Sequence, residues 1–285
     1  MKRILVTGAN GQLGQSILEQ SKKYKDIECF FVTRNELDIT NEDLINYYFE
    51  DKSFDVVVNC AAYTAVDKAE DDKENAYLVN AKATEFLAKI TKAKEIPLIH
   101  ISTDYVFDGT ESKPHLETDQ TNPIGVYGQT KLEGEKFALE NNPKTIILRT
   151  SWVYSRFGNN FVKTMLRLFK EKDSIAVVAD QIGSPTNAID LADAILTIIS
   201  KDKFEYGIFN YSNEGECSWF DFAQKIKEFS NSTIEIDPVP TSAYPTKAKR
   251  PAYSLLDKTK IKEVYQLDIP TWEDSLKEEL KYLII

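Results

Sequence analysis

The chain has 285 residues, of which 45 are aspartate or glutamate and 35 are lysine or arginine, giving a formal net charge of −10. This length is sufficient for one large α/β domain, or for such a domain with a smaller lobe. The negative charge disfavours binding along a nucleic-acid backbone, which carries the same sign.

Three further features of the sequence narrow the class of protein: the cysteines, the histidines and the first residues. Cys29, Cys60 and Cys217 are widely spaced beside apolar runs, which indicates buried thiols rather than disulfides. His100 and His115 show no metal-ligand spacing, so no metal site is predicted. The first apolar run is too short for a signal peptide, and no segment has the length of a membrane span. We therefore expect a soluble cytoplasmic protein that binds neither nucleic acid nor membranes.

Short runs rich in β-branched residues alternate with helical segments over the first half of the chain. The expected strands are 4–6, 27–32, 56–58, 98–101 and 146–148, with helices at 42–49, 77–90 and 131–139. Such alternation predicts an α/β fold with a Rossmann-type, doubly wound parallel sheet. A ligand is then expected at the carboxyl ends of the strands.

The pattern changes after Trp152. Residues 156–187 are expected to be loop and helix, followed by a helix at 188–200, a short strand at 207–211 and a proline-rich extended loop at 237–251. We predict an NAD(P)-binding Rossmann domain over 1–155, to which the 207–211 strand returns. The remainder, 156–285, is predicted to be mostly a smaller substrate-binding lobe.

Three glycines, Gly8, Gly11 and Gly14, follow the first expected strand and precede a helix. Glycine permits a tight turn and lets the backbone approach a pyrophosphate, while the helix N-terminus presents free N–H groups to the anion. This spacing and its position predict a dinucleotide-binding turn.

The second expected strand ends at Arg34, where NAD-preferring sites usually place an acidic residue for the ribose 2′-hydroxyl. A guanidinium there can pair with a 2′-phosphate, which favours NADP(H). The alternative is an exposed arginine without a ligand. Asp38 and Ile39 follow and are expected to line the adenine pocket.

Tyr127 and Lys131 are spaced to lie one turn apart on the same face of a helix. We expect the ammonium to lower the pKa of Tyr127 from about 10 toward the working pH, which would make the phenol a general acid–base. Tyr48 and Lys52 have the same spacing, but no turn delivers them to a cleft, and we assign them to a helix surface. Thr103 precedes Tyr127 at the end of a strand, and this chain order distinguishes the first pair from the second.

The sequence resembles the extended short-chain dehydrogenases/reductases. The motifs that carry the resemblance are Thr-Gly-x-x-Gly-x-x-Gly at 7–14, Ser-Thr-Asp-Tyr-Val-Phe-Asp-Gly at 102–109 and Tyr-Gly-x-Thr-Lys at 127–131. Within this class the chain is similar to the dTDP-4-dehydrorhamnose reductase family, in segments 62–70, 149–154, 158–162, 180–186 and 249–251. The resemblance implies NADPH-dependent reduction of the 4-keto group of dTDP-4-dehydro-L-rhamnose to dTDP-L-rhamnose.

The resemblance also implies roles for individual residues. Thr103 would polarise the sugar carbonyl, Tyr127 would donate the proton, and Lys131 would hold the nicotinamide ribose. The sugar nucleotide would be bound by Thr103, Asp104, Trp152 and Arg250, with Arg250 at its diphosphate. Together with Arg34, the expected cofactor contacts are Gly8, Asn10, Gly11, Gln12, Leu13, Asp38, Ile39, Ala62, Tyr63, Thr64, Tyr127 and Lys131. NADPH is the expected cofactor with NADH left open, and the chain would be a monomer or homodimer.

Two positions depart from the family pattern. Gln15 stands where some members have an acidic residue linked to a divalent ion at a dimer interface, so metal-dependent dimerisation is not expected. Ser155 stands where a glycine is common, which we interpret as a surface variation.

Other functions remain open at this point. Related 4,6-dehydratases have two acidic residues after the threonine, whereas here Asp104 is followed by Tyr105. Epimerases usually carry small residues there and retain NAD, which Arg34 disfavours. A non-catalytic relative, such as the regulatory subunit of methionine adenosyltransferase, shares the fold and many motifs. The complete set of Thr103, Tyr127 and Lys131 favours catalysis over that reading.

Overall fold

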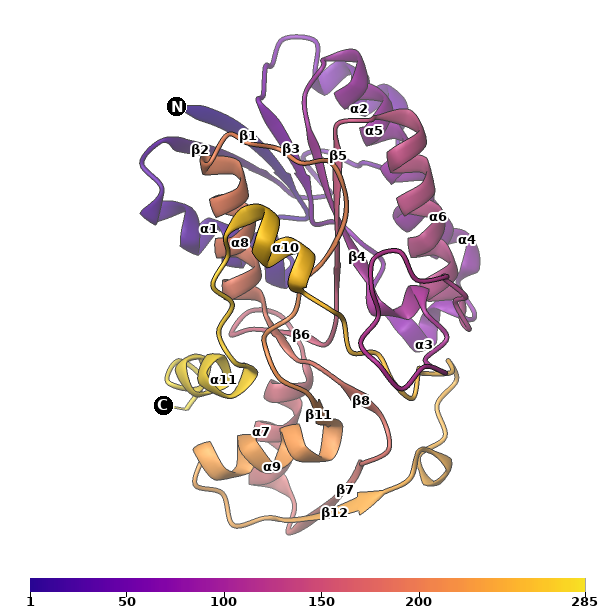
Figure 1. The fold of residues 1–285 in the computed structure, drawn as a ribbon, viewed down its shortest axis with the longest axis vertical. Helices are drawn as coiled ribbons and strands as arrows, with labels where there is room; N and C mark the ends of the chain where they lie inside the picture. Colours follow the sequence, from indigo (N-terminus) through magenta and orange to yellow (C-terminus); the bar gives the residue numbers. More distant parts are fainter. Residues whose placement is uncertain (285) are drawn as a thin grey trace.

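A six-stranded parallel sheet occupies one half of the computed structural model, which describes residues 1–284 (Figure 1). The strands are β1 (Lys2–Thr7), β2 (Ile27–Val32), β3 (Val56–Asn59), β4 (Leu98–Thr103), β5 (Thr145–Thr150) and β10 (Gly207–Asn210). Their order is β10-β5-β4-β3-β1-β2, and every neighbouring pair is parallel. The direction of winding reverses beside β1, where folds of this kind bind ligands. The predicted fold class is confirmed.

Helices cover both faces of the sheet, which explains its apolar, β-branched strands. Ile4 and Val6 pack in the core that includes α1 (Gln12–Gln20) and α8 (Ala188–Ser200). Leu5, between them, packs in the opposite core. That second core includes side chains from α2 (Glu42–Tyr48), α5 (Ala83–Ala93) and α6 (Val126–Asn141).

The helix expected at 77–90 is longer and interrupted. It is preceded by α3 (Val66–Ala69) and runs as α4 (Lys73–Tyr77), a π-helical turn (Leu78–Lys82) and α5. Asn80, within the π-helical turn, accepts a hydrogen bond from the Tyr63 N–H and donates to the Tyr63 carbonyl and to Thr130 Oγ1. The irregular turn therefore ties the segment after β3 to α6.

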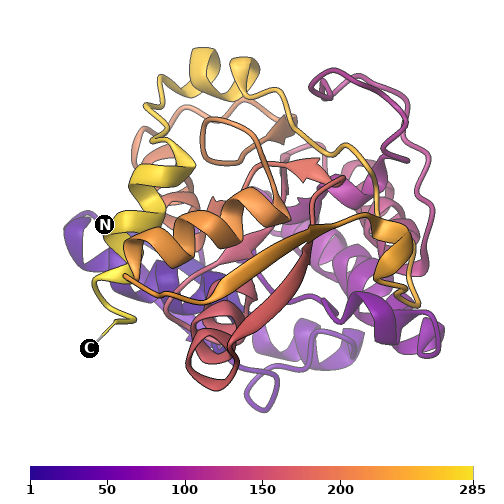
Figure 2. The same cartoon turned by 90° about the horizontal axis from the view of Figure 1, so that it is seen from below.

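A third core lies below the sheet in Figure 1. Its main elements are α7 (Phe161–Glu171), β7 (Ser174–Val178), α9 (Trp219–Phe229), β12 (Glu235–Val239) and α11 (Trp272–Leu280). Figure 2 shows β7 and β12 side by side, and they pair in parallel. Tyr154, Phe222 and Trp272 are among the large buried side chains of this core.

The smaller elements complete the chain. They are β6 (Val153–Tyr154), β8 (Ile182–Gly183), β9 (Thr186–Asn187), β11 (Cys217–Ser218), α10 (Thr259–Tyr265) and short 3-10 turns at Ser21–Lys23, Asp104–Val106 and Thr241–Ala243.

Two expectations for this half of the chain were wrong. Residues 156–187 contain the strand β7 besides helix and loop, and the predicted loop at 237–251 begins inside β12. Pro238 is compatible with a strand here because a two-stranded sheet has only edge strands, where a missing N–H leaves no ladder bond unmade. The domain boundary near residue 155 stays a prediction.

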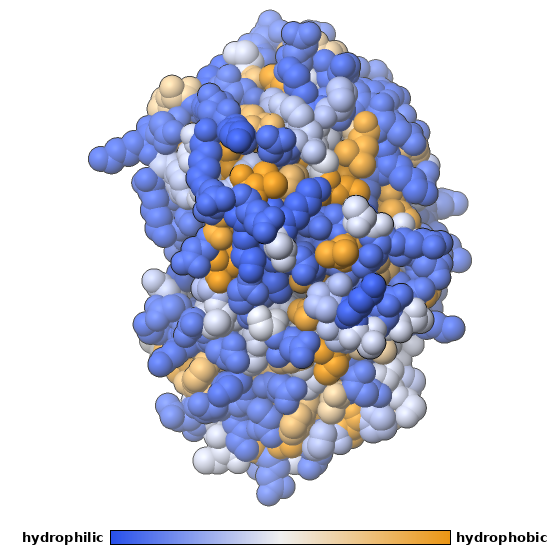
Figure 3. All heavy atoms as spheres, viewed as in Figure 1, coloured by the Kyte–Doolittle hydropathy of each residue, from blue (hydrophilic) through white to orange (hydrophobic). Residues whose placement is uncertain are grey.

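The face of the molecule seen in Figure 1 is mostly polar. Figure 3 shows mostly hydrophilic side chains there. No helix within residues 1–284 has the length and apolar character needed to cross a membrane. All three cysteines are free thiols, with Cys217 buried and Cys29 and Cys60 half-buried.

Candidate active site

Two adjoining cavities lie at the carboxyl ends of the strands. One has a volume of about 530 Å³ and the other about 360 Å³. They share Asn10, Gly11, Cys60, Ala61 and Ala62, so together they form one extended groove beside the glycine-rich turn. All the predicted site residues except Arg250 line this groove.

The glycine-rich turn passes close to the segment after β3. Gly8 has φ +68°, and a Cβ there would lie 2.6 Å from the Ala61 nitrogen. A Cβ on Gly14 would lie 2.5 Å from the Gly8 carbonyl oxygen. Gly11 precedes α1 without a side-chain cap, which leaves the first N–H groups of the helix free to bind an anion. The turn therefore fits the pyrophosphate role predicted for it.

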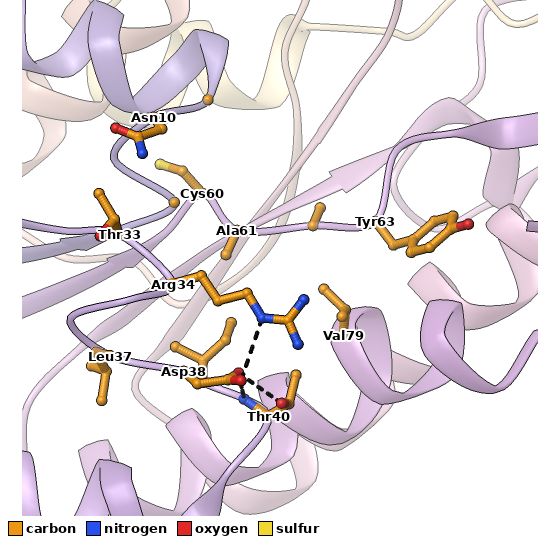
Figure 4. A pocket seen from close by; sticks show the side chains of 14 residues that line it. Asn10, Thr33, Arg34, Leu37, Asp38, Thr40, Cys60, Ala61, Tyr63 and Val79 are labelled. Atoms are coloured by element: carbon orange, nitrogen blue, oxygen red, sulfur yellow. Dashed lines mark hydrogen bonds and ion pairs between the residues drawn. The ribbon is translucent and has the colours of Figure 1, made fainter. Parts of the chain in front are cut away.

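The smaller cavity is bounded by Arg34 and by residues after β2 (Figure 4). The Arg34 side chain is 75% exposed, and its Nε lies 3.3 Å from Asp38 Oδ2. Asp38 Oδ1 accepts hydrogen bonds from the N–H and hydroxyl of Thr40, which fix the carboxylate. The ion pair thus holds a guanidinium at the cavity mouth, where it can reach an incoming phosphate.

The larger cavity brings together Thr103 from β4 with Tyr127 and Lys131 from α6. The Thr103 side chain lies close enough to the Tyr127 phenol to influence its pKa. Lys131 Nζ donates to the Ile101 carbonyl oxygen at 2.6 Å. The three groups predicted to carry the chemistry therefore share one cavity, with the lysine anchored to the strand that carries the threonine.

The expected fall in the pKa of Tyr127 is not what the structure shows. Loss of hydration in the cavity wall raises the pKa of Tyr127 to about 12, and it exceeds the opposing effect of the nearby Thr103 side chain. Burial also lowers the pKa of Lys131 to about 8, although Glu135 acts in the other direction. The lysine points to the Ile101 carbonyl, so its charge is not aimed at the phenol. Tyr127 is thus a protonated phenol, the form needed in a proton donor.

Asp104 lies directly beside these groups. Its side chain is buried, it lines the larger cavity, and its Oδ1 accepts a hydrogen bond of 2.9 Å from the Thr103 hydroxyl. Burial raises the pKa of Asp104 to about 6, against the opposing effects of the neighbouring Ser254 and Thr103 side chains. Asp104 therefore helps to orient the threonine hydroxyl.

Two stacked tryptophans close one side of the larger cavity. The rings of Trp152 and Trp219 lie 3.6 Å apart between centroids and within 10° of parallel. Trp152 has φ +47°, an unusual conformation for a bulky residue that often marks a functional site. Sequence reasoning missed Trp219: the capping box of Ser218 and Asp221 signals that a helix starts there, but not that this end faces the cavity.

Arg250 does not line either cavity. Its NH2 lies 2.7 Å from Asp67 Oδ2, and the same carboxylate accepts from the Ala248 N–H. This pair fastens the loop after β12 to α3. The predicted contact of Arg250 with a diphosphate would require the guanidinium to leave Asp67.

Ser155 is fully buried, so the interpretation as a surface variation was wrong. Its hydroxyl hydrogen-bonds Gln12 Oε1 at 3.1 Å, and Gln12 Oε1 also accepts from Asn160 Nδ2. These contacts tie the loop after β6 to the first residue of α1. The glycine-rich turn is therefore braced by the second half of the chain.

The second Tyr-x-x-x-Lys pair lies outside both cavities. Lys52 Nζ lies 4.0 Å from the centroid of the Tyr48 ring, which stacks on Phe54. The pair is a local surface contact, as expected from its place in the chain.

A Rossmann sheet, a glycine-rich turn, and a threonine beside a Tyr-x-x-x-Lys pair define a short-chain dehydrogenase/reductase of the extended kind. The RmlD substrate binding domain family matches residues 1–284. A dTDP-4-dehydrorhamnose reductase of Aggregatibacter actinomycetemcomitans is 42% identical over 292 residues, covering 99% of each chain. One of Sinorhizobium fredii is 40% identical, covering 99% of this chain and 98% of the relative. The chain belongs to the dTDP-4-dehydrorhamnose reductase family.

Solved structures agree with this assignment. The Clostridium acetobutylicum dTDP-4-dehydrorhamnose reductase has a TM-score of 0.95 and 44% identity, covering 99% of this chain and 100% of that one. A Bacillus anthracis member in complex with NADP has a TM-score of 0.93 and 40% identity, covering 98% of this chain and 99% of that one. A dTDP-glucose 4,6-dehydratase in complex with NAD is 18% identical at a TM-score of 0.83, which shows the shared fold alone.

Proposed function

We propose that this protein reduces the 4-keto group of dTDP-4-dehydro-L-rhamnose with NADPH, giving dTDP-L-rhamnose. The observation that carries the proposal is the gathering of Thr103, Tyr127 and Lys131 in one cavity of about 530 Å³ beside the glycine-rich turn. The substrate is inferred from the relatives, which are dTDP-4-dehydrorhamnose reductases. The choice of NADPH is supported by the Bacillus anthracis relative, whose structure contains NADP.

The side chains of the cavity account for the proton chemistry. When bound, NADPH supplies the hydride for C4 of the sugar. Tyr127 gives its phenolic proton to the carbonyl oxygen. Thr103 turns its hydroxyl proton from Asp104 Oδ1 to the same oxygen when the substrate binds, and this hydrogen bond polarises the carbonyl. Lys131 holds the nicotinamide ribose through the N–H groups that Ile101 does not use. Because the phenol is protonated beforehand, the reduction starts with its proton in place.

The second half of the chain supplies the wall against which the sugar nucleotide would pack. Gly158, Asn159 and Trp219 line the larger cavity from this part of the chain, next to Trp152. We infer that the lobe after residue 155 binds the sugar nucleotide, whereas the Rossmann part binds the cofactor.

The reductase activity is tested directly with purified protein, NADPH and the 4-keto sugar nucleotide. Loss of NADPH absorbance is expected only when all three are present. A correctly folded protein that leaves NADPH unconsumed would instead support the non-catalytic alternative.

Replacing Arg34 with alanine is expected to raise the KM for NADPH by about tenfold or more, because a charge-assisted contact with the 2′-phosphate is lost. The KM for NADH should change little, since NADH lacks that phosphate. Steady-state kinetics with both cofactors measure the difference. An equal effect on the two cofactors would show that Arg34 does not read the 2′-phosphate.

Replacing Trp219 with alanine is expected to lower kcat/KM for the sugar nucleotide by about twofold to tenfold, because Trp152 loses its stacking partner. Binding of NADPH, measured by fluorescence titration, should stay at the wild-type level. If NADPH binding fell while kcat/KM at saturating NADPH were preserved, Trp219 would belong to the cofactor site.

A further inference from the structure

His100 is a fully buried histidine that the proposed mechanism does not use. It lies on β4, between Asn59 at the end of β3 and Lys131 on α6. Its Nδ1 is 3.2 Å from Asn59 Nδ2, and its Nε2 is 3.4 Å from Lys131 Nζ. Both ring nitrogens thus face a nitrogen atom of a neighbouring side chain, and the protons on those neighbours decide what each ring nitrogen does.

The orientation of the Asn59 amide fixes the role of Nδ1. Asn59 Oδ1 accepts from the Ala61 N–H at 3.3 Å and from the Thr7 hydroxyl at 2.6 Å. A backbone N–H can only donate, so the oxygen of Asn59 must face Ala61 and its NH₂ group must face His100. His100 Nδ1 is therefore the acceptor of this hydrogen bond.

The remaining proton of the ring must then lie on Nε2. Burial lowers the pKa of His100 well below its usual value, and the neighbouring Lys131 charge acts in the same direction. A neutral imidazole carries one ring proton, and Nδ1 is already an acceptor. The Nε2–H group therefore faces the Lys131 ammonium. Both groups are hydrogen-bond donors, so neither can accept from the other.

We propose that His100 is a positioning residue for Lys131. Its Nε2–H group, whose position is fixed by Asn59, offers the ammonium no hydrogen-bond acceptor on the sheet side. The N–H groups of Lys131 are therefore directed to the Ile101 carbonyl and to the cleft. The inference rests on the proposed role of Lys131 in binding the nicotinamide ribose. A protein acceptor in place of Nε2–H would hold the ammonium inward and leave fewer of its donors for the cofactor.

The other groups around Lys131 are consistent with this role. Cys60 faces it from the segment after β3, and desolvation raises the pKa of that thiol, which keeps it neutral. Tyr127, one turn earlier on α6, is likewise a neutral phenol. Glu135, one turn later, is committed to a buried ion pair with an arginine. His100 is thus the neutral ring that borders the ammonium on the sheet side.

The tautomer can be measured without any catalytic assay. The chain has two histidines, His100 and His115, so ¹⁵N NMR of the ring nitrogens is assigned with a single His115→Gln variant. We expect His100 to be neutral through the neutral pH range, with its proton on Nε2. A proton on Nδ1, or a titrating imidazolium, would overturn the proposal whether or not the protein is a reductase.

An Asn59→Asp variant reverses the arrangement with little change in shape. Its carboxylate can still accept from Ala61 and Thr7, but it would also accept from His100, moving the ring proton to Nδ1. Nε2 would then accept from the Lys131 ammonium. The new acceptor stabilises the Lys131 ammonium, so we expect the pKa on the alkaline side of the kcat/KM profile to rise by roughly one pH unit. NADPH binding should weaken severalfold, because fewer N–H groups of Lys131 face the cofactor.

His115→Gln is the matched control, because His115 stacks on Phe107 outside both cavities. Its pH profile and NADPH affinity should match those of the wild type. The proposal fails if Asn59→Asp switches the tautomer but leaves the pH profile and NADPH affinity at wild-type values. If that variant does not fold, the tautomer of the wild-type protein still decides the matter.

Discussion

Replacing Tyr127 with phenylalanine is expected to lower kcat by about a hundredfold to ten-thousandfold, because the phenolic proton is lost at the step that forms the alcohol. Affinity for NADPH should stay within a few-fold, since the phenol acts mainly in the transition state. Steady-state kinetics and a separate binding titration measure the two quantities.

The chain contains its own control for this experiment. Tyr48→Phe removes the hydroxyl of the second Tyr-x-x-x-Lys pair, which lies outside both cavities, and kcat should not change. A Tyr127→Phe enzyme with near-normal kcat would place the proton donor elsewhere. Asp104 would then be the first group to examine, because it is buried in the same cavity and hydrogen-bonded to Thr103.

Replacing Arg149 with alanine is expected to reduce the free energy of unfolding by about 3–5 kcal/mol. Arg149 makes two hydrogen bonds to Glu135, with side chains only 3% and 2% exposed, and Ser102 also donates to that carboxylate. Without the guanidinium, Glu135 becomes a buried charge that has lost the cation hydrogen-bonded to it. Urea denaturation monitored by circular dichroism measures the loss.

Arg167→Ala provides the comparison on the surface. Arg167 pairs with Glu171 one turn away, but the two side chains are 60% and 49% exposed, so the loss should stay below about 0.5 kcal/mol. If Arg149→Ala cost no more than Arg167→Ala, the buried pair would not be important for stability.

The parts of the fold that sequence predicted best are those whose local signals agree. The β-branched runs of the sheet and the helix at 188–200 were predicted because apolar periodicity, small breakers and helix ends coincide. The strand β7 was missed because it is half-exposed and lies after a helix without a strong turn signal. The last residues of β12 were predicted to be loop because Pro238 usually indicates a loop.

Within the site, chain order predicted which residues converge, but not how they are oriented. Thr103, Tyr127 and Lys131 share a cavity as predicted, whereas the direction of the Lys131 ammonium depends on a backbone carbonyl and on desolvation. Arg250 is held by an ion pair with Asp67, which lies far away in the sequence. Trp219 is placed at the cavity by stacking on Trp152, which is also distant in the sequence. Neither contact has a signature in local sequence.

We propose that this chain directs hydride transfer from NADPH to C4 of the 4-keto sugar, with Tyr127 providing the proton. The most direct test uses NADPH with deuterium at the transferable position and analyses the product by NMR and mass spectrometry. We expect dTDP-L-rhamnose with one deuterium, bonded to C4. A product without deuterium, or with deuterium at another carbon, would contradict it.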